Sequence, residues 1–260
     1  MSSSGLHTEV IRPADRPTGG RADRLVLAHG FTQNGRCWGD FAGLMAAGHE
    51  VVLVDAPGHG HSSHDDANLW RAADMLATAG GPAVYVGYSM GGRTALHAAL
   101  AKPEAVKGLV LIGATAGLEN ESDRAERRLA DAALADRLLA DGLPAFLDRW
   151  LAAPLFAGLD AAQATVEQRL TNRAEGLAAS LRNCGTGTQE SLWPRLAELT
   201  MPVLIVVGSQ DQKFGAIGRR MMAAMTNTDA ELVEVAGGHA VHLEQPAKTT
   251  AAILEAITRW

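Results

Sequence analysis

Short apolar runs recur along the chain and are separated, for the most part, by stretches with helical periodicity. The runs are rich in valine, leucine and isoleucine, and they span residues 24–29, 50–54, 82–87, 108–113, 202–208 and 231–235. Continuous apolar runs of this length are typical of strands buried on both faces, and the helical stretches between them provide the crossovers that a parallel sheet needs. The pattern therefore predicts a doubly wound α/β fold on a mostly parallel sheet.

The spacing changes between Gly113 and Leu199, where strand-like runs stop and long helical segments begin. Asn120 is placed to cap one helix, which continues through the apolar positions that follow it, and residues 143–156 and 165–181 give further helical stretches. These segments interrupt the alternation of strands and helices. We interpret them as a cap inserted into the fold.

The chain is accordingly predicted to have one α/β core with one insertion. The expected parts are a flexible leader of residues 1–22, a core of residues 23–114 and 197–260, and a helical cap of residues 115–196. A cap of this kind covers the carboxyl edge of the sheet, closes a site to water and supplies residues that select the substrate.

Composition narrows the class of partner. The 260 residues are 47% hydrophobic and 20% charged, which suits one full-sized core. A net charge of −6 and a pI of about 5.8, without a basic tract, disfavour nucleic acid and anionic membranes as partners. The first residues are not followed by a long apolar segment, so we expect neither a signal peptide nor membrane insertion, and a cytoplasmic location.

The two cysteines indicate neither a disulfide framework nor a zinc site. Cys37 and Cys184 lie far apart in the sequence and outside any CxxC pattern. No spacing typical of metal ligands or of a cofactor motif is present elsewhere. We therefore predict no metal and no cofactor.

Ser89 lies between two glycines at a predicted junction of a strand and a helix. The sequence Gly87-Tyr88-Ser89-Met90-Gly91 follows an apolar run and leads into an amphipathic helical segment. This is the pattern of a nucleophile elbow, in which the glycines permit a sharp turn that presents the serine Oγ above the sheet. Ser89 is therefore the predicted catalytic serine.

A serine hydroxyl needs a histidine to take its proton and an acid to orient that histidine. Asp211 follows the carboxyl end of the predicted strand 202–208, and His239 lies on a glycine-rich loop after the last predicted strand. The order Ser89, Asp211, His239 is the order found in α/β-hydrolases. We predict these three residues as the catalytic triad.

Both predicted partners of Ser89 have an alternative interpretation. An Asx turn at the start of the next helix is the other role for Asp211. His242, three residues after His239, is the competing histidine, but it falls at the start of the following helical region.

Two backbone N–H groups are the expected oxyanion hole. One belongs to Met90, directly after the serine, and the other to Phe31, which ends the sequence His29-Gly30-Phe31 after the first predicted strand. A tight turn at His29-Gly30 is compatible with this role. The histidines of the loop 55–62, after the second predicted strand, are interpreted as residues of a turn rather than as ligand-binding groups.

Several arginines are candidates for binding an anionic substrate. Arg93 lies four residues after Ser89, one helical turn on, so its side chain can point along the same rim. Four more lie on predicted cap helices: Arg124, Arg127, Arg128 and Arg169. Guanidinium groups beside an activated serine suit a substrate with several carboxylates. The alternative for any one of them is a surface ion pair with a nearby acidic residue.

Seven segments of the chain, most of them outside the elbow, resemble those of one known family. They are Gly87–Arg93, Gly117–Arg127, Trp150–Phe156, Arg169–Asn172, Gly176–Leu181, Gly185–Gly187 and Gly208–Phe214. Together they resemble the 2-succinyl-6-hydroxy-2,4-cyclohexadiene-1-carboxylate (SHCHC) synthases of menaquinone biosynthesis, a family of lyases with the α/β-hydrolase fold. The resemblance spans about residues 24–258, cap included.

The resemblance implies a lyase reaction. Members of that family eliminate pyruvate from 2-succinyl-5-enolpyruvyl-6-hydroxy-3-cyclohexene-1-carboxylate to form SHCHC. By this resemblance, Ser89 acts with His239 and Asp211 as a base that removes a ring proton, and the N–H groups of Phe31 and Met90 stabilise oxyanion charge. The substrate is a small molecule with three carboxylates, and no cofactor is implied.

The resemblance also implies a set of substrate-binding residues. They are Tyr88, Arg93, Arg124, Trp150 and Arg169. The three carboxylates of the substrate account for the arginines in this set.

Two other functions stay open at this point. The same elbow, triad and cap also serve serine hydrolases, either carboxylesterases or enzymes that cleave carbon–carbon bonds, acting on a small carboxylated or acyl substrate. Some α/β-hydrolase folds are ligand receptors or scaffolds, but a complete set of Ser89, Asp211 and His239 argues against a role in binding alone.

Overall fold

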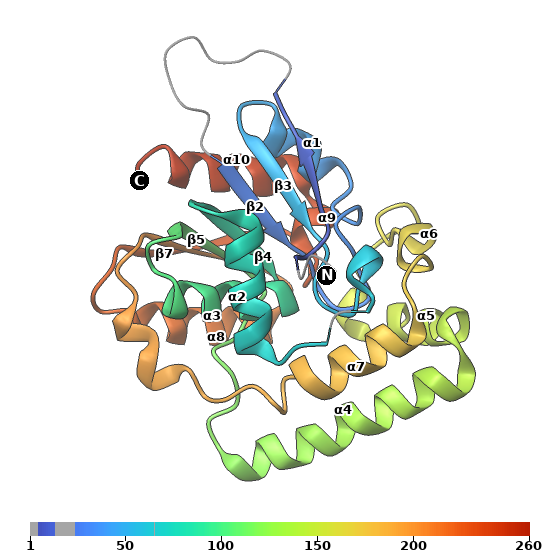
Figure 1. Cartoon of the computed structure of the whole chain (residues 1–260). Coiled ribbons are helices and arrows are strands. Elements are labelled where there is room, and N and C mark those ends of the chain that lie inside the picture. Colours follow the sequence, from blue (N-terminus) through green and yellow to red (C-terminus); the bar gives the residue numbers. More distant parts are fainter. Residues whose placement is uncertain (1–4, 14–23, 65) are drawn as a thin grey trace.

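The computed structural model describes residues 5–13, 24–64 and 66–260, and it has the predicted α/β architecture (Figure 1). The strands are β1 Thr8–Ile11, β2 Arg24–Ala28, β3 Glu50–Val54, β4 Ala83–Tyr88, β5 Val106–Ile112, β6 Val203–Gly208 and β7 Ala230–Val235. They form one sheet in the order β1-β3-β2-β4-β5-β6-β7. All neighbouring pairs are parallel except β1 with β3, so the predicted, mostly parallel sheet is confirmed.

Strand β1 lies within the segment predicted to be a flexible leader. It pairs antiparallel with β3, with Thr8 opposite Val54 and Ile11 opposite Val51. This strand corrects the prediction for its own four residues, while residues 1–4 and 14–23 of the predicted leader lie outside the described residues. The sequence hides β1 because an edge strand is short and only partly buried, and so lacks a continuous apolar run.

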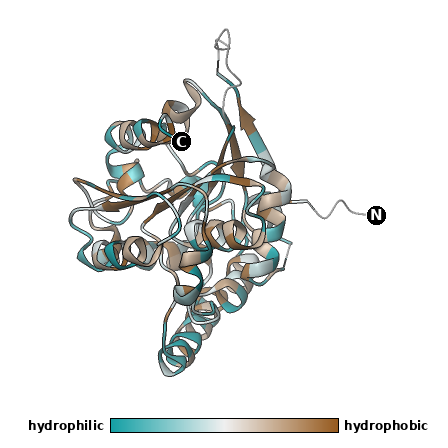
Figure 2. Cartoon of the chain, turned by 90° about the vertical axis from the view of Figure 1, so that its left-hand side faces the viewer, coloured by the Kyte–Doolittle hydropathy of each residue, from teal (hydrophilic) through white to brown (hydrophobic). Residues whose placement is uncertain are grey.

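Helices cover both faces of the sheet. One face carries α2 Leu69–Gly80, α3 Met90–Ala101 and α8 Gln212–Ala224, and the other carries α1 Asp40–Ala46, α9 Val241–Glu244 and α10 Pro246–Ile257. Successive strand residues point to opposite faces, so Val26 packs in the core under the first group of helices and Leu25 and Leu27 in the core under the second. Figure 2 shows the strands as hydrophobic ribbons inside the molecule.

Four helices and a short 3-10 turn follow β5, in the segment predicted to be a cap. They are α4 Glu121–Asp141, α5 Leu143–Leu151, η2 Pro154–Phe156, α6 Val166–Arg169 and α7 Ala174–Cys184. Helices α4 and α7 run side by side, and Leu138, Phe146 and Leu177 belong to a small core of their own (Figure 1). Two further 3-10 turns are present. They are η1 Gly60–Ser62, which follows β3, and η3 Trp193–Glu198, which precedes β6.

Two of the helical stretches predicted in this segment are broken. The stretch 143–156 ends as a helix at Leu151, because Pro154 has no N–H to continue the ladder. The stretch 165–181 is interrupted at residues 170–173, where the Asn172 side chain accepts from Gly60 N at 2.7 Å and donates to Thr32 O at 2.8 Å. The break therefore lets Asn172 bind two loops of the core.

No helix in the described part of the chain is long and apolar enough to cross a membrane.

Helix α3 approaches the sheet closely behind the serine turn. A Cβ added at Gly91 would overlap with the carbonyl carbon and oxygen of Ala28 at the end of β2, and one at Gly92 would lie 2.6 Å from the Ala114 Cβ. Glycine at these positions thus sets the distance between the elbow and the strand that precedes Phe31.

Gly91→Ala is expected to destabilise the fold by about 3 kcal/mol or more, because backbone atoms cannot move aside as the end of a flexible side chain can. Gly43→Ala is the matched control on α1, since a Cβ there meets nothing within 4 Å, and it should be neutral or stabilising by up to about 1 kcal/mol. Urea unfolding measures both. Equal shifts of the two midpoints would contradict close packing at Gly91.

Candidate active site

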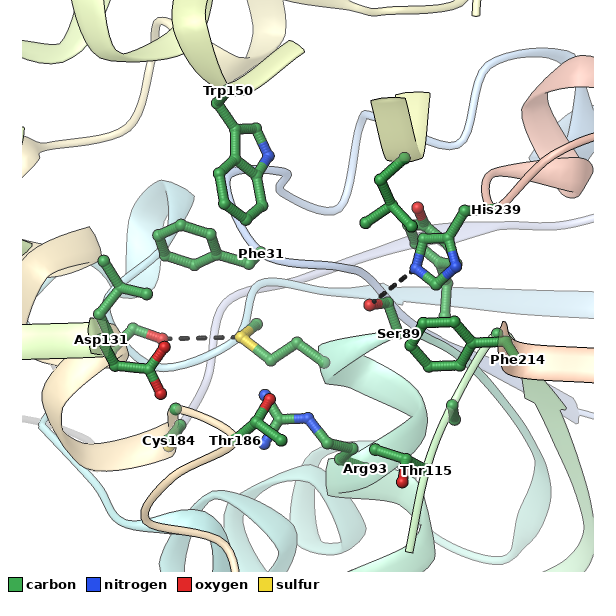
Figure 3. A pocket seen from close by; sticks show the side chains of 18 of the residues that line it. Phe31, Ser89, Arg93, Thr115, Asp131, Trp150, Cys184, Thr186, Phe214 and His239 are labelled. Atoms are coloured by element: carbon green, nitrogen blue, oxygen red, sulfur yellow. Dashed lines mark hydrogen bonds between the residues drawn. The ribbon is translucent and has the colours of Figure 1, made fainter. Parts of the chain in front are cut away.

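The structure brings Ser89, His239 and Asp211 together at the carboxyl edge of the sheet. Ser89 Oγ lies 3.2 Å from His239 Nε2 (Figure 3). His239 Nδ1 lies 2.7 Å from Asp211 Oδ2. Ser89 has φ 50°, ψ −106°, outside the usual regions for a residue with a side chain, which is the strained turn expected of an elbow. The three groups thus form a continuous chain of contacts.

Asp211 combines both roles considered from the sequence. Its Oδ2 contacts His239, while its Oδ1 accepts from Phe214 N at 3.2 Å and so caps α8. The cap fixes the carboxylate at the end of β6. The turn and the orienting contact are therefore compatible.

Packing fixes the plane of the His239 ring. The Phe214 ring lies 4.5 Å from it between centroids and the Tyr88 ring 5.4 Å. Gly113, at φ 55°, lies against the ring, and a Cβ there would come within 2.9 Å of the His239 Cε1. With two rings and a backbone segment around it, the imidazole is held facing Ser89.

His242 has a different environment from His239. Its ring is buried against Tyr88 and Trp38, at centroid distances of 4.3 Å and 5.0 Å, and neither ring nitrogen has a hydrogen-bond partner among the described residues. Burial, with a smaller contribution from nearby His239, lowers the pKa of His242 to about 3. A neutral ring without contact to the serine is a packing residue.

The predicted oxyanion residues, Phe31 and Met90, both line the pocket that contains Ser89. The loop that carries Phe31 is braced by Gly30 N, which donates to Gln33 Oε1 at 2.9 Å, and by His29 Nε2, which accepts from Ala56 N at 3.0 Å. Asn172, between α6 and α7, also holds the loop, because its Nδ2 donates to Thr32 O at 2.8 Å. The oxyanion role of the two N–H groups stays a prediction.

The pocket lies between the triad and helices α4 to α7. It is lined on the core side by Tyr88, Ser89, Arg93, Lys213, Phe214 and His239, and on the other side by Arg127, Leu134, Trp150, Phe156 and Arg169, among others. Figure 3 shows Ser89, Arg93, Trp150, Phe214 and His239 around this pocket. Trp150 packs against Phe31, with centroids 5.3 Å apart, and its Nε1 is buried without a partner among the described residues. Of the predicted binding residues, Tyr88, Arg93, Trp150 and Arg169 therefore share one pocket.

Arg93 and Arg169 are buried cations. Arg93 is 7% exposed and Arg169 is 1% exposed. Arg93 Nη1 lies 3.4 Å from Gln189 Oε1, while Arg169 Nε donates to Ala164 O at 2.7 Å and its Nη1 contacts Thr32 Oγ1. Neither pairs with an acidic group in the part of the chain that the structure describes.

Burial lowers the pKa of both guanidinium groups, that of Arg93 to about 10. Each still carries its charge at neutral pH. A buried charge without a counter-ion is costly, and an anionic ligand that enters the pocket relieves that cost. The pocket is thus suited to carboxylates.

Arg124 does not reach this pocket, which corrects its predicted placement. Its Nη2 pairs with Glu121 Oε2 at 2.6 Å, and its Nη1 donates to the carbonyl groups of Leu118 and Glu119. Arg127, one turn further along α4, lines the pocket instead, with its Nε donating to Asp131 Oδ1 at 2.7 Å. The spacing alone cannot separate the two arginines, because they lie close to the same face of the helix and only the local ion pair decides between them.

Lys213 was not identified from the sequence as a pocket residue. It lies two residues after Asp211, in the first turn of α8, and lines the pocket beside Phe214. Its position two residues after Asp211, in the first turn of the helix that Asp211 caps, is the signal that would have indicated it.

None of the pocket residues that the structure describes belongs to a cluster with metal-ligand geometry. The group of histidine and acidic side chains with such geometry, His7, Asp55 and His61, lies on the loops around β1 and β3.

Comparison with known proteins identifies the family. The model of the alpha/beta hydrolase family matches residues 25–253. The chain belongs to the alpha/beta hydrolase family. This family member is 36% identical over 241 residues to a putative SHCHC synthase of Bacillus subtilis, covering 86% of each chain. It is 34% identical over 236 residues to an SHCHC synthase of Salmonella paratyphi C, covering 87% of this chain and 90% of the relative.

Solved structures agree with the fold of this α/β hydrolase. The structure of MenH from S. aureus superposes with a TM-score of 0.84 at 30% identity, over 97% of this chain and 98% of that one. The enol-lactonase of Burkholderia xenovorans shares the fold at 21% identity, with a TM-score of 0.77 over 97% of this chain and 96% of that one.

Stability of this α/β hydrolase is expected to fall in mild acid. Burial lowers the pKa of His242 and His59 to about 3 and that of His29 and His97 to about 4. In the unfolded chain the same groups bind protons near pH 6.5. Between about pH 4 and 6.5 each such histidine therefore makes the free energy of unfolding fall on acidification, by up to about 1.4 kcal/mol per pH unit.

His242→Leu is therefore expected to make that dependence shallower by about 1 kcal/mol per pH unit between about pH 5 and 6. Urea unfolding at several pH values measures the slope. Phe41→Leu, which loosens the packing beside His242 without removing a titrating group, should lower stability equally at each pH. An unchanged slope in His242→Leu would contradict a neutral, buried His242 ring.

Proposed function

We propose that this α/β hydrolase is an SHCHC synthase, a lyase that eliminates pyruvate from 2-succinyl-5-enolpyruvyl-6-hydroxy-3-cyclohexene-1-carboxylate in menaquinone biosynthesis. One observation supports the proposal most strongly. Arg93 and Arg169 are buried in the pocket that contains Ser89. Neither arginine pairs with an acidic side chain among the described residues. The substrate carries three carboxylates, which match such a pocket. The names of the relatives that cover most of the chain support the same assignment.

The reaction follows from the substrate and product structures. The C2 proton is removed, its electron pair forms the C2=C3 bond, and the C3=C4 pair shifts to C4=C5 as the C5–O bond breaks. The leaving group departs as the enolate of pyruvate and takes up one proton, so the protons balance. The product is the conjugated 2,4-diene.

The triad supplies the base for the first step. Ser89 Oγ passes its proton to His239 Nε2 at 3.2 Å and takes the C2 proton, and the Asp211 carboxylate, 2.7 Å from Nδ1, stabilises the imidazolium. No covalent bond to Ser89 is needed. The imidazolium then holds the proton that returns to the leaving group or to water.

The C2 proton is acidic because C2 bears the succinyl ketone. Its removal places negative charge on the ketone oxygen, which the N–H groups of Phe31 and Met90 are proposed to stabilise. The oxyanion hole therefore serves an enolate here, where in an esterase it would serve a tetrahedral intermediate.

Cationic side chains orient the three carboxylates. We assign this role to Arg93, Arg127 and Arg169, with Lys213 as a further cation at the rim near Asp211. Tyr88 and Trp150 supply apolar surface for the ring, and Trp150 Nε1 is free to donate to the ligand. Arg124 acts only by supporting the start of α4.

The assignment of residues 115–196 as a substrate-selecting cap belongs to the same proposal. The cytoplasmic location, the polycarboxylated substrate and the exclusion of nucleic acid as a partner also remain predictions.

A serine hydrolase is the second candidate function, favoured by the Ser89–His239–Asp211 contacts themselves. The same groups activate a serine for attack on an ester. The two functions differ in one step, because the hydrolase forms an acyl bond to Ser89 and the lyase does not.

Ser89→Ala is expected to lower kcat for pyruvate release by about 10³-fold or more, with the free energy of unfolding nearly unchanged. Pyruvate is measured with freshly generated substrate, together with the diene absorbance. The serine hydrolase would be favoured if the wild-type protein released pyruvate only at the spontaneous rate and hydrolysed simple esters. Near-normal turnover by Ser89→Ala would contradict the triad in either function.

Arg127→Ala and Arg124→Ala form a matched pair on one helix. Loss of a charge-assisted contact to a carboxylate predicts a decrease of kcat/KM by about 10- to 100-fold for Arg127→Ala. Arg124→Ala is expected to change kcat/KM by less than about 3-fold, because this side chain pairs with surface groups. The reverse order of effects would contradict the placement of Arg127 in the binding site.

A further inference from the structure

Three side chains outside the active site converge at the loop that follows β3. His7 precedes β1, Asp55 follows the last residue of β3, and His61 lies in η1. One ligand-type atom from each lies within 4.8 Å of the others. The two imidazole rings pack edge to face, with centroids 4.4 Å apart. Asp55 is buried and His61 is exposed, so the cluster opens to solvent on one side.

The backbone holds this cluster in place. His7 N donates to Ser62 Oγ at 2.9 Å, and His7 O accepts from Asp55 N at 3.0 Å. Asp55 Oδ1 accepts from Gly35 N at 2.7 Å, and its Oδ2 accepts from His61 N at 2.8 Å. Each carboxylate oxygen keeps a second lone pair for another partner. The three side chains are therefore positioned by a network that leaves their ligand capacity free.

The imidazole rings have no hydrogen bonds that would explain the arrangement. Neither ring bonds to a described residue, and His7 Nε2 is buried without a partner. The acid nearest to His7 Nε2, Glu9, lies 3.6 Å away and is already held by Arg36 Nη2 at 2.6 Å. A buried imidazole nitrogen without a partner is costly, which points to a missing partner at this place.

We propose that His7, Asp55 and His61 form a binding site for a divalent transition-metal ion, with zinc as the expected occupant. Two imidazoles and one carboxylate are a donor set suited to zinc and its neighbours, whereas magnesium and calcium favour oxygen ligands. Ligand atoms of a tetrahedral zinc site lie about 3.4 Å apart, given zinc–ligand bonds of about 2.0–2.1 Å. Small side-chain rotations therefore close the site. The exposed side leaves a fourth position for water.

The position of the site gives it a structural role. The ion links the segment before β1 to the loop that contains η1, and Gly60 N in that loop donates to Asn172 Oδ1 at 2.7 Å. Asn172 lies between α6 and α7. A bound ion thus fixes the core loop that contacts the helices covering the pocket. Ligand spacing in the sequence gives no sign of this site, because His7 lies far along the chain from the loop that carries Asp55 and His61.

The test is metal binding by the full-length, tag-free protein. Equilibrium dialysis against zinc chloride, followed by elemental analysis, is expected to give one zinc per chain, with Tm rising by several degrees at zinc about 100-fold above Kd. Cobalt(II) should give the intense visible bands of a tetrahedral site. Magnesium chloride should not bind there.

His7→Gln and His61→Gln are expected to weaken zinc binding by at least about 10-fold and to abolish the cobalt bands. His64→Gln, an exposed substitution in the same loop, is the matched control and should bind as the wild type does. Circular dichroism verifies that each variant folds. Stoichiometric zinc retained in the His7→Gln/His61→Gln double variant, or no zinc bound by folded wild-type protein, would overturn the proposal.

Discussion

The close approach of α3 to the sheet is the constraint on which the rest of the site depends. Glycine at positions 87, 91 and 92 permits the tight turn at Ser89, and the start of α3 then lies against the carbonyl group of Ala28 at the end of β2 without an intervening side chain. Ser89 is held at a positive φ by this packing. Its Oγ therefore projects from the sheet edge at a fixed point, within reach of a histidine from a loop 150 residues later.

That geometry supplies reactivity but not specificity. The contacts of Ser89, His239 and Asp211 fit a base as well as a nucleophile, and a shared fold does not decide between them. The buried charges of the pocket indicate the class of substrate more specifically. Two guanidinium groups are buried beside the serine without acidic partners among the described residues, and an anionic substrate is the simplest source of the missing charge. Substrate binding and catalytic electrostatics would then share the same pocket.

The sequence predicted the fold well where the signal was periodic. The six apolar runs correspond to β2 to β7, with ends shifted by at most two residues. Strands β2 to β6 are almost wholly buried, which is why their runs are continuous, whereas β7 is a partly buried edge strand that still keeps an apolar run. The shared edge of a parallel sheet was enough to bring Ser89, Asp211 and His239 together. Their catalytic roles stay predictions. The edge strand β1 was missed, since partial burial leaves no apolar run.

Details set by local contacts could not be predicted in the same way. Arg124 and Arg127 share a helix face, and an ion pair with Glu121 decides which of them faces outward. Pro154 and the side chain of Asn172 break helices that periodicity alone would continue. The cluster of His7, Asp55 and His61 depends on the antiparallel pairing of β1, which no spacing in the sequence indicates.

In the proposed reaction Ser89 serves as a base for the C2 proton and forms no covalent bond with the substrate. The most direct test is single-turnover pyruvate release from substrate deuterated at C2, with the intact mass of the enzyme followed in the same rapid-quench samples. If Ser89 acts only as a base, pyruvate release is slower from the deuterated substrate, and the mass of the enzyme stays unchanged throughout. Equal rates for the two substrates, with a transient adduct on Ser89, would contradict this role.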